Sequence, residues 1–224
     1  MKIGAVTIGQ SPRVDILPEI REILGPGVEI LERGALDGLG LKEAKDLRLG
    51  RRGSILVTRM KDGTEVKVTK QYVVQRLTNC ISELEDNGVE LSILLCTEDF
   101  PEIESKKLLL RPDRVLQSMV AAVSEKCKLG VIIPSPDQIQ ATKKKWAWRE
   151  SSVVVGAISP YTGTGKQIFE IANKFKKLRV DLTILDCMGF NRMTKAVFRH
   201  VTKKPVLLPR TILGRIAREI VEIE

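Results

Sequence analysis

The segment Val89-Glu-Leu-Ser-Ile-Leu-Leu-Cys96 decides the fold, because the chain contains a second version of it, Val180-Asp-Leu-Thr-Ile-Leu-Asp-Cys187. The two segments align without gaps; Val, Leu, Ile, Leu and Cys are identical, and Glu/Asp and Ser/Thr are conservative exchanges. Two buried strands can look alike simply because both draw on Val, Ile and Leu, with cysteine as a small core residue. The shared order of acid, hydroxyl and cysteine favours instead two similar lobes, each with a cysteine at the end of a strand.

Apolar runs of strand length alternate with helix-period stretches along most of the chain. The expected strands are Lys2–Ile8, Val28–Arg33, Val89–Cys96, Leu129–Ser135, Val153–Ser159, Val180–Cys187 and Pro205–Leu208. The expected helices are Val14–Leu24, Gln71–Asn87, Pro112–Glu125, Asp137–Trp148, Lys166–Lys177, Arg192–Thr202 and Thr211–Ile223. This alternation predicts the α/β class, with two similar flavodoxin-like lobes related by a pseudo-twofold axis, each a parallel sheet flanked by helices.

One stretch departs from the alternation. Residues of alternating character in Ser54–Lys70 flank Lys61-Asp62-Gly63, which is a strong hairpin signal. We therefore expect an antiparallel β-hairpin inserted in the first lobe. We also expect residues 1–110 and 208–224 to form that lobe, completed by the C-terminal helix, and residues 111–207 to form the second.

The composition is that of a chain able to bury a core, with 43% hydrophobic and 29% charged residues among 224. No apolar run approaches the roughly 18 residues of a membrane span, and Met1–Ile8 has the character of a first strand rather than a signal peptide. We expect a cytoplasmic protein with no membrane partner. The 4 cysteines form no C-x-x-C pair and His200 is the single histidine, so the sequence predicts no disulfide framework and no metal site.

The net charge of +9 has two interpretations. Lysines and arginines are spread along the chain, which favours a basic solvated surface over a nucleic-acid site. Trp146 and Trp148 beside Lys143–Lys145 are compatible with an aromatic and basic patch, or with a helix anchored on its sheet. We expect the second arrangement and no nucleic-acid partner.

Four segments are similar to signatures of the AroM family. They are Thr7-Ile-Gly-Gln-Ser-Pro-Arg13, Leu95-Cys-Thr-Glu-Asp-Phe-Pro101, Leu185-Asp-Cys-Met-Gly-Phe190 and Leu208-Pro-Arg-Thr-Ile-Leu-Gly-Arg-Ile-Ala217. They span nearly the whole chain in the expected order. By its fold the AroM family resembles the aspartate/glutamate racemase superfamily, which includes hydantoin racemases and maleate isomerases.

This resemblance implies that Cys96 and Cys187 are catalytic and face each other across an interlobe cleft that holds a small anionic molecule, a carboxylate. It implies a racemase or isomerase without a cofactor, and a homodimer by analogy with the racemases. Many racemases have Asn-Thr after the first cysteine and Thr-His after the second, whereas this chain has Thr97-Glu98 and Met188-Gly189. The alternative is therefore a non-catalytic sensor or carrier of an anionic metabolite linked to aromatic biosynthesis.

Candidate ligand-binding residues follow the expected strands, because α/β folds bind ligands at the carboxyl ends of parallel strands. After the first strand come Thr7, Gln10, Ser11 and Arg13, which suit an anion at a helix N-terminus; a simple Ser-Pro turn is the alternative. The planar guanidinium of Arg13 suits a carboxylate. A helix N-terminus after each cysteine would favour its thiolate.

Further candidates follow the later strands. Thr97 adjoins the first cysteine, and Thr162 and Thr164 lie in a loop that is no P-loop, because Pro160 and Gln167 replace the required Gly and Ser/Thr. Arg210 and Thr211 open the last helix, either near the ligand or as a helix cap with an exposed arginine.

The remaining cysteines and the acids beside the candidate pair complete the predictions. Cys80 falls in an apolar helical stripe and should be a core residue, while Cys127 has no evident chemistry. Glu98, Asp99 and Asp186 lie next to the candidate cysteines, where acids either assist or raise the thiol pKa. We expect Cys96 and Cys187 to be more exposed and more reactive than Cys80.

Overall fold

Two four-stranded parallel sheets organise the chain, as expected for the α/β class. The computed structural model describes residues 1–48, 53–123, 126–147 and 152–221. The chain divides into unit 1, which contains Met1–Val115 and Arg210–Glu224, and unit 2, which contains Leu116–Pro209. Three predicted helix ends, at Glu125, Trp148 and Ile223, lie outside the described residues.

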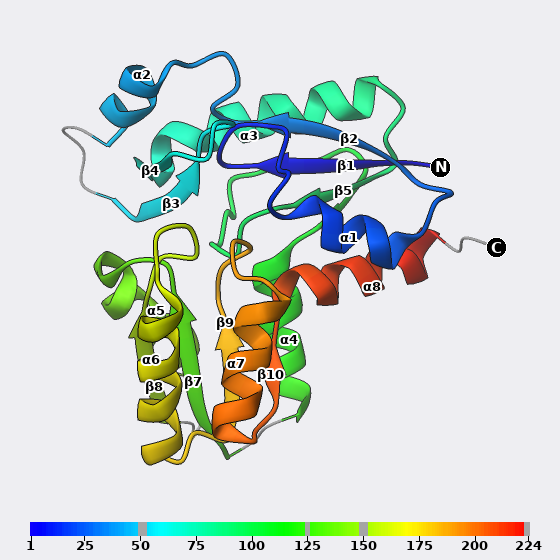
Figure 1. The fold of residues 1–224 in the computed structure, drawn as a ribbon. Helices are drawn as coiled ribbons and strands as arrows, with labels where there is room; N and C mark the ends of the chain where they lie inside the picture. Colours follow the sequence, from blue (N-terminus) through cyan, green and yellow to red (C-terminus); the bar gives the residue numbers. More distant parts are fainter. Residues whose placement is uncertain (49–52, 124–125, 148–151, 222–224) are drawn as a thin grey trace. The chain divides into compact units, whose positions relative to one another are not determined.

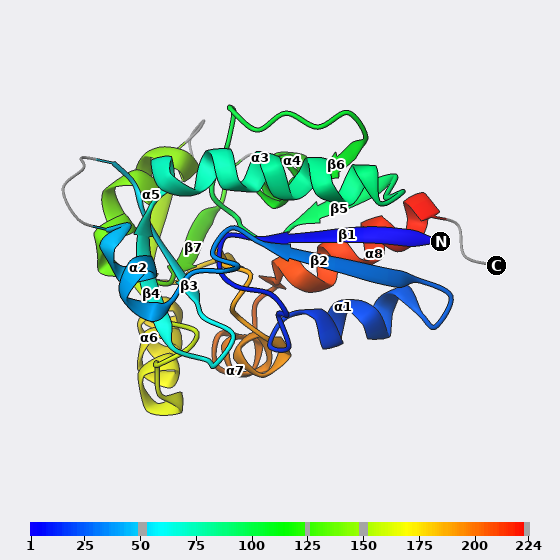
Figure 2. The same cartoon turned by 90° about the horizontal axis from the view of Figure 1, so that it is seen from above.

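Unit 1 is built on the sheet β2-β1-β5-β6. Its strands are β1 (Lys2–Thr7), β2 (Glu29–Gly34), β5 (Leu91–Leu94) and β6 (Leu108–Leu110). Helix α3 (Lys70–Asp86) covers one face, and α1 (Leu17–Leu24) and α8 (Pro209–Val221) cover the other (Figures 1 and 2). The apolar stripe of α3, which includes Cys80, packs on the buried strands, so the predicted core role of Cys80 is confirmed.

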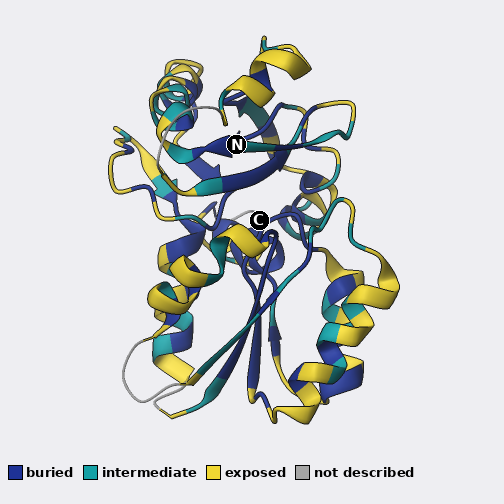
Figure 3. Ribbon diagram, turned by 90° about the vertical axis from the view of Figure 1, so that its left-hand side faces the viewer, coloured by how far each residue is buried: buried dark blue, intermediate teal, exposed yellow. Residues whose placement is uncertain are grey.

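Unit 2 is built on the sheet β10-β9-β7-β8. Its strands are β7 (Lys128–Ile133), β8 (Ser152–Ala157), β9 (Leu182–Leu185) and β10 (Val206–Leu207). Helices α6 (Gly165–Lys177) and α7 (Arg192–Thr202) lie on one face, where Phe175 and Phe198 meet edge to face with centroids 5.8 Å apart. Helix α4 (Pro112–Val123) and the turn η1 (Pro136–Gln138) with α5 (Ile139–Trp146) lie on the other, and the strands between the helix layers are mainly buried (Figure 3).

The two sheets have the same connectivity. In unit 1, β1 pairs with β2 and β5, and β5 pairs with β6; in unit 2, β7 pairs with β8 and β9, and β9 pairs with β10. Strands β5 and β9, which carry the repeated segment, therefore occupy equivalent places. The register agrees as well, since Gly4 pairs with Ser92 and Gly130 pairs with Thr183. The two similar lobes expected from the repeat are confirmed.

The inserted hairpin is also confirmed, as β3 (Ile55–Arg59) paired antiparallel with β4 (Glu65–Thr69). At its turn Gly63 has φ of +97°, which favours glycine, and Asp62 accepts a hydrogen bond from the Thr64 N–H at 2.8 Å. The short helix α2 (Leu41–Asp46) and the short strand β6 were not expected. Their lengths, 6 and 3 residues, are too small to show a period in the sequence.

One difference between the units matters for the candidate site. Helix α7 connects β9 to β10, whereas residues 95–107, which connect β5 to β6, form no helix. Unit 1 therefore has no counterpart of α7.

Candidate functional site

Cys187 lies in a tight turn between β9 and α7. Its N–H donates to the Leu185 carbonyl at 2.8 Å, and the Gly189 N–H donates to the Cys187 Sγ at 3.4 Å. A Cβ on Gly189 would lie 2.6 Å from the Pro160 ring, so only glycine fits this turn. Helix α7 begins five residues after Cys187, with Asn191 as its N-cap. An amide that donates to sulfur favours the thiolate over the thiol.

Cys96 lies in the equivalent position after β5 but in a different environment. The preceding Leu95 N–H donates to the Val6 carbonyl at 2.7 Å, which fixes the strand end against β1. The next helix along the chain is α4, which begins only at Pro112. The expectation that a helix N-terminus follows each cysteine is therefore wrong for Cys96, because unit 1 lacks the helix that α7 provides in unit 2.

The burial of the cysteines also differs from expectation. Cys96 and Cys187 are 8% and 9% exposed, and Cys80 is 8% exposed. Cys96 shares the hydrophobic core of unit 1 with Cys80, and Cys187 packs in the core of unit 2. The prediction that the candidate pair is more exposed than Cys80 is wrong, because the strand ends that carry them are covered by apolar side chains. Cys127 is half-buried.

Asp186, directly before Cys187, is buried and fully engaged within unit 2. Its carboxylate accepts a hydrogen bond from the Trp146 Nε1 at 2.8 Å and lies 3.0 and 3.1 Å from the Lys145 Nζ through its two oxygens. The Lys145 ammonium also lies 5.3 Å from the centroid of the Trp146 ring. Trp146 is completely buried and anchors α5, as expected, and cannot stack on a nucleic-acid base; Trp148 lies outside the described residues.

The acids after Cys96 are paired too, although more loosely. Glu98 Oε1 lies 3.8 Å from the Lys70 Nζ, which also donates to the Asp99 carbonyl and lies 5.2 Å from the centroid of the Phe100 ring. The Asp99 carboxylate accepts a hydrogen bond from Arg111 at 3.0 Å. Thr97, between Cys96 and these acids, is buried.

Three of the predicted ligand-binding residues gather around Asp15. Arg13 is 2% exposed and donates from Nη1 to the Thr7 hydroxyl at 2.7 Å and from Nε and Nη2 to the two Asp15 oxygens at 2.9 and 2.8 Å. Arg13 therefore clamps a carboxylate, as its planar fork suits, but this carboxylate belongs to the chain. Burial raises the pKa of Asp15, but the hydrogen bonds from Arg13 and the charges of Arg13 and Arg59 outweigh it and hold that pKa below its ordinary value.

Arg210 is the third member of this group. It opens α8, is 1% exposed, donates from Nη1 to the Asp15 carbonyl at 2.8 Å, and lies 3.4 Å from the Glu19 carboxylate. The alternative of a helix cap with an exposed arginine is wrong, because α8 packs on α1. Thr211, the next residue, is buried.

Gln10 and Ser11 hold the loop after β1 in place. The Gln10 amide donates to the Leu36 and Leu39 carbonyls at 3.1 and 2.8 Å, and its oxygen accepts from the Lys61 N–H at 3.0 Å. Ser11 donates through its N–H and hydroxyl to the Asp37 carboxylate, at 2.8 and 2.7 Å. These bonds tie the loop to the hairpin and to the segment after β2, so both side chains have a structural role.

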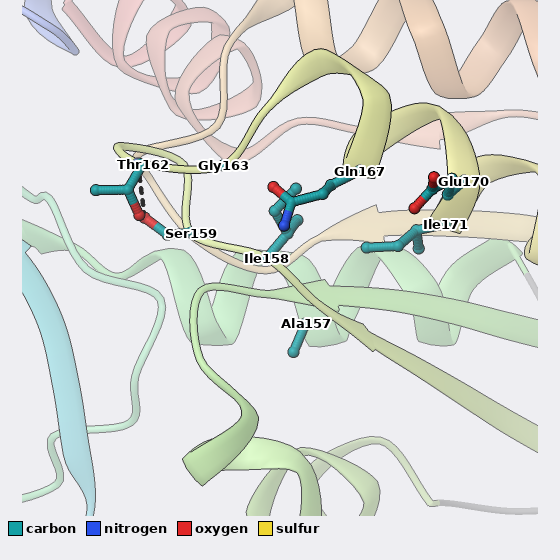
Figure 4. A pocket seen from close by; sticks show the side chains of 8 residues that line it. All are labelled: Ala157, Ile158, Ser159, Thr162, Gly163, Gln167, Glu170 and Ile171. Carbon is teal, nitrogen blue, oxygen red and sulfur yellow. Dashed lines mark hydrogen bonds between the residues drawn. The ribbon is translucent and has the colours of Figure 1, made fainter.

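A cavity of about 270 Å³ lies in unit 2 beside the end of β8 and the first turns of α6 (Figure 4). It is lined by Ala157, Ile158, Ser159, Thr162, Gly163, Gln167, Glu170 and Ile171. Thr162 is one of these lining residues, and its N–H donates to the Ser159 hydroxyl at 3.0 Å. The Glu170 carboxylate in the lining disfavours an anion at that end of the cavity.

Thr164 does not line this cavity. It is the N-cap residue of α6. Its hydroxyl accepts from the Gln167 N–H at 3.3 Å, while the Gln167 side chain accepts from the Thr164 N–H at 2.9 Å. This reciprocal pair is a capping box. The loop therefore stabilises the start of α6. Gln167, the residue that is incompatible with a P-loop, completes the capping box.

Sequence reasoning missed the partners that engage these residues. Lys70 and Lys145 carry no local signal, because each acts on an acid that folding brings to it from elsewhere in the chain. Asp15 lies only two residues after Arg13, but its carbonyl also accepts a hydrogen bond from the distant Arg210. The basic run Lys143–Lys145 predicts solvated side chains, yet the side chain of Lys145 is only 20% exposed.

The comparisons with known proteins agree with this architecture. A family model described as AroM protein matches residues 3–221. The chain belongs to the AroM family. No sequence among curated proteins matches this AroM family chain.

Solved structures similar to this AroM family chain include two glutamate racemases and an isomerase. The glutamate racemase from Aquifex pyrophilus matches with TM-score 0.60 and 17% identity, covering 100% of this chain and 84% of that one. The Francisella tularensis glutamate racemase in complex with D-glutamate gives 0.61 and 14%, with 98% and 80% covered. The maleate isomerase Iso from Pseudomonas putida S16 gives 0.64 and 11%, with 100% and 94% covered. At such identities the similarity establishes the fold and leaves the reaction open.

Two general features of the described residues bear on this site. No group of three or more His, Cys, Asp or Glu side chains among them is placed to hold a metal ion. None of the helices they form is both long and apolar enough to cross a membrane.

Proposed function

We propose that this AroM family protein is a racemase or isomerase that acts on a small carboxylate without a cofactor. The thiolate of one cysteine, Cys96 or Cys187, removes the proton from the carbon beside the carboxylate, and the thiol of the other returns a proton to that carbon. The pair of electrons left on carbon is held by the adjoining carboxylate until the second proton arrives, so each turnover leaves the two cysteines with their protonation states exchanged.

The equivalence of the two cysteines carries this proposal. Each follows a strand in the same place of a sheet with the same connectivity, at the carboxyl end, where α/β folds bind ligands. A two-base proton transfer needs two similar groups, and a repeated fold supplies them. The Gly189 amide on the Cys187 sulfur supports a thiolate in unit 2.

The names of the structural neighbours support the class of substrate. Glutamate racemase, one example of which holds D-glutamate, and maleate isomerase both act on small carboxylic acids. For the ligand of this chain we propose contacts from the hydroxyls of Thr97, Thr162 and Thr211. Arg13 and Arg210, whose guanidiniums are paired with Asp15 and Glu19, contribute by holding in place the loop after β1 and the start of α8.

Exchange of solvent deuterium into candidate substrates tests the proposal. The protein is incubated in D₂O with a panel of amino and hydroxy dicarboxylic acids, in which the carbon beside the carboxylate is saturated and carries a removable proton, and incorporation of deuterium at that carbon is followed by NMR. We expect exchange with one class of acid and a loss of at least about 100-fold in Cys96→Ser and Cys187→Ser, the usual scale for a lost acid–base group. Cys127→Ser is the matched control and should retain exchange. Exchange that survives both cysteine substitutions would contradict the proposal.

A second function, a sensor or carrier of an anionic metabolite, is favoured by two observations. Cys96 and Cys187 are as buried as the core residue Cys80, and the fork of Arg13 is occupied by Asp15. This function predicts that a carboxylate raises the melting temperature while no deuterium enters it, and that Cys187→Ser leaves the shift unchanged. The same panel of acids, followed by thermal unfolding, separates the two functions.

A further inference from the structure

Asp186, a buried acid, is the residue directly before Cys187 in the chain, and a negative charge one residue away disfavours ionisation of the thiol. A like charge close to a thiolate disfavours the charged form, and low dielectric surroundings strengthen the effect. The Asp186 side chain is only 4% exposed, so water screens it poorly. An active thiolate at Cys187 therefore requires that this negative charge be compensated.

Lys145 supplies that compensation from α5. Its ammonium lies 3.0 and 3.1 Å from the two oxygens of Asp186, and its position is fixed further by the Trp146 ring at 5.3 Å. Trp146 donates its indole N–H to the same carboxylate at 2.8 Å, and this hydrogen bond orients the Asp186 carboxylate toward α5. In this group the carboxylate of Asp186 accepts hydrogen bonds from both the Lys145 ammonium and the Trp146 indole.

We propose that Lys145 is a positioning residue for Cys187: it neutralises Asp186 and holds the carboxylate on α5, so that the neighbouring thiol can ionise. This inference deepens the proposed function and rests on it, because only a cysteine that must ionise needs the compensation. It gives a role to a lysine that the sequence places in an unremarkable basic run, and to an acid that by itself argues against thiolate chemistry.

Unit 1 contains a looser version of the same arrangement. Lys70 lies over the Phe100 ring and 3.8 Å from Glu98, two residues after Cys96. In both units, therefore, a lysine that contacts an aromatic ring balances an acid within two residues of the candidate cysteine. Glu98 is 28% exposed and farther from its lysine, so we expect its effect on Cys96 to be smaller than that of Asp186 on Cys187.

The alkylation rate of Cys187 in the folded protein tests the charge argument without any substrate. Only the thiolate reacts, so the rate of modification by iodoacetamide, followed by mass spectrometry at neutral pH, reports its population. Lys145→Met leaves Asp186 uncompensated and should slow Cys187 about three- to tenfold. Asp186→Asn leaves Lys145 uncompensated and should accelerate it by about the same factor. The double variant should lie within about twofold of the unsubstituted protein, because both charges are gone.

A matched control exists at the other end of the same strand. Asp181 directly precedes β9, and its carboxylate lies 3.4 Å from the Lys204 Nζ. The Lys204 and Asp181 side chains are 48% and 50% exposed. Lys204→Met should leave the Cys187 rate unchanged. Thermal unfolding of each variant verifies that it is folded at the labelling temperature.

Opposite signs for the two single variants are the decisive result. If the group only anchors α5, its loss loosens the surroundings of Cys187, and both single variants react faster; that outcome, or no change in either, overturns the inference. The proposed function fails separately, by the absence of deuterium exchange that depends on Cys187. A normal exchange rate in Lys145→Met, together with unchanged labelling, would remove this inference and leave the proposed function standing.

Discussion

Arg13 binds the carboxylate of Asp15 through two hydrogen bonds, 2.9 Å from its Nε and 2.8 Å from its Nη2. The Asp15 carbonyl also accepts a hydrogen bond from Arg210, at 2.8 Å. The family segment Thr7–Arg13 and the helix that opens at Pro209 thus meet at one acid. Asp15 joins residues that are far apart in the sequence. Its substitution should therefore lower the free energy of unfolding more than it lowers the affinity for a ligand.

Asp15→Asn should destabilise the protein by about 2–4 kcal/mol at neutral pH, because the buried guanidinium of Arg13 loses its counter-charge. The pKa of Asp15 is lowered in the folded state from its ordinary value of 3.8. The contribution of this carboxylate is therefore complete above that value and is lost as the pH falls through the lower, folded-state pKa. Urea unfolding at neutral and acidic pH measures it.

The control for this prediction is Asp181→Asn. Its pKa is also lowered, chiefly by a hydrogen bond from the Lys128 N–H, but the side chain is 50% exposed. We expect a loss below about 1 kcal/mol. A stability difference between Asp15→Asn and the unsubstituted protein that stays constant from neutral pH to strongly acidic pH would show that the Arg13–Asp15 ion pair is not its origin.

Gly130→Ala should destabilise unit 2 by about 1–3 kcal/mol, through overpacking at the point where α6 rests on β7. A Cβ on Gly130 would lie 2.7 Å from Val180 and would overlap the ring of Phe175, which is fully buried and cannot move aside. Gly165, the first residue of α6, has no atom within 4 Å of its virtual Cβ, so Gly165→Ala should be neutral or slightly stabilising. Thermal unfolding of both variants makes the comparison.

Thr164→Ala should cost about 1 kcal/mol, because the capping box of α6 loses its hydroxyl acceptor. Thr164→Ser keeps that hydroxyl and should retain most of the stability. If Thr164 acts mainly on a ligand, the two variants will instead differ in ligand-induced thermal shift while unfolding alike in its absence. Chemical denaturation with and without a bound carboxylate distinguishes these results.

The fold was predictable where a local signal and the packing agree. The predicted helix Arg192–Thr202 has the observed ends, because Asn191 caps its start and Lys203, in a left-handed conformation with φ of +58°, ends it. The repeated strands were predictable because a parallel sheet buried on both faces demands apolar runs. Strand β6 was not, since Leu108–Leu110 exists only by pairing with β5 and follows a polar segment.

The candidate site was predictable in its positions but not in its partners. The repeat places Cys96 and Cys187 at equivalent strand ends, yet it cannot show that only the second is followed by a helix. A position at a helix N-terminus predicts an exposed side chain for Arg210, because such ends are usually solvated. Here α8 packs on α1, and Arg210 is buried. Ion pairs such as Lys145–Asp186 join residues 41 apart, and no local pattern encodes such a pair.

The four cysteines should differ in reactivity even though three of them share the same burial. Burial first, and then the charges of Glu83 and Asp37, raise the pKa of the Cys80 thiol to about 11. Cys187 has nearly the same exposed fraction as Cys80, but its sulfur accepts a hydrogen bond from the Gly189 N–H, which favours its thiolate. Cys127 is the least buried of the four.

We therefore expect iodoacetamide to modify Cys127 first, Cys187 next and Cys80 last in the folded protein. The rate at Cys80 should keep rising with pH throughout the mildly alkaline range, because its thiolate stays a small fraction until the pH nears 11. Mass spectrometry after short exposures gives the order, with urea-unfolded protein as the reference in which all four react alike. Equal rates at Cys80 and Cys187 would mean that local opening, and not the surroundings of each sulfur, controls access to both, and the Gly189 amide would then have no part in activating Cys187.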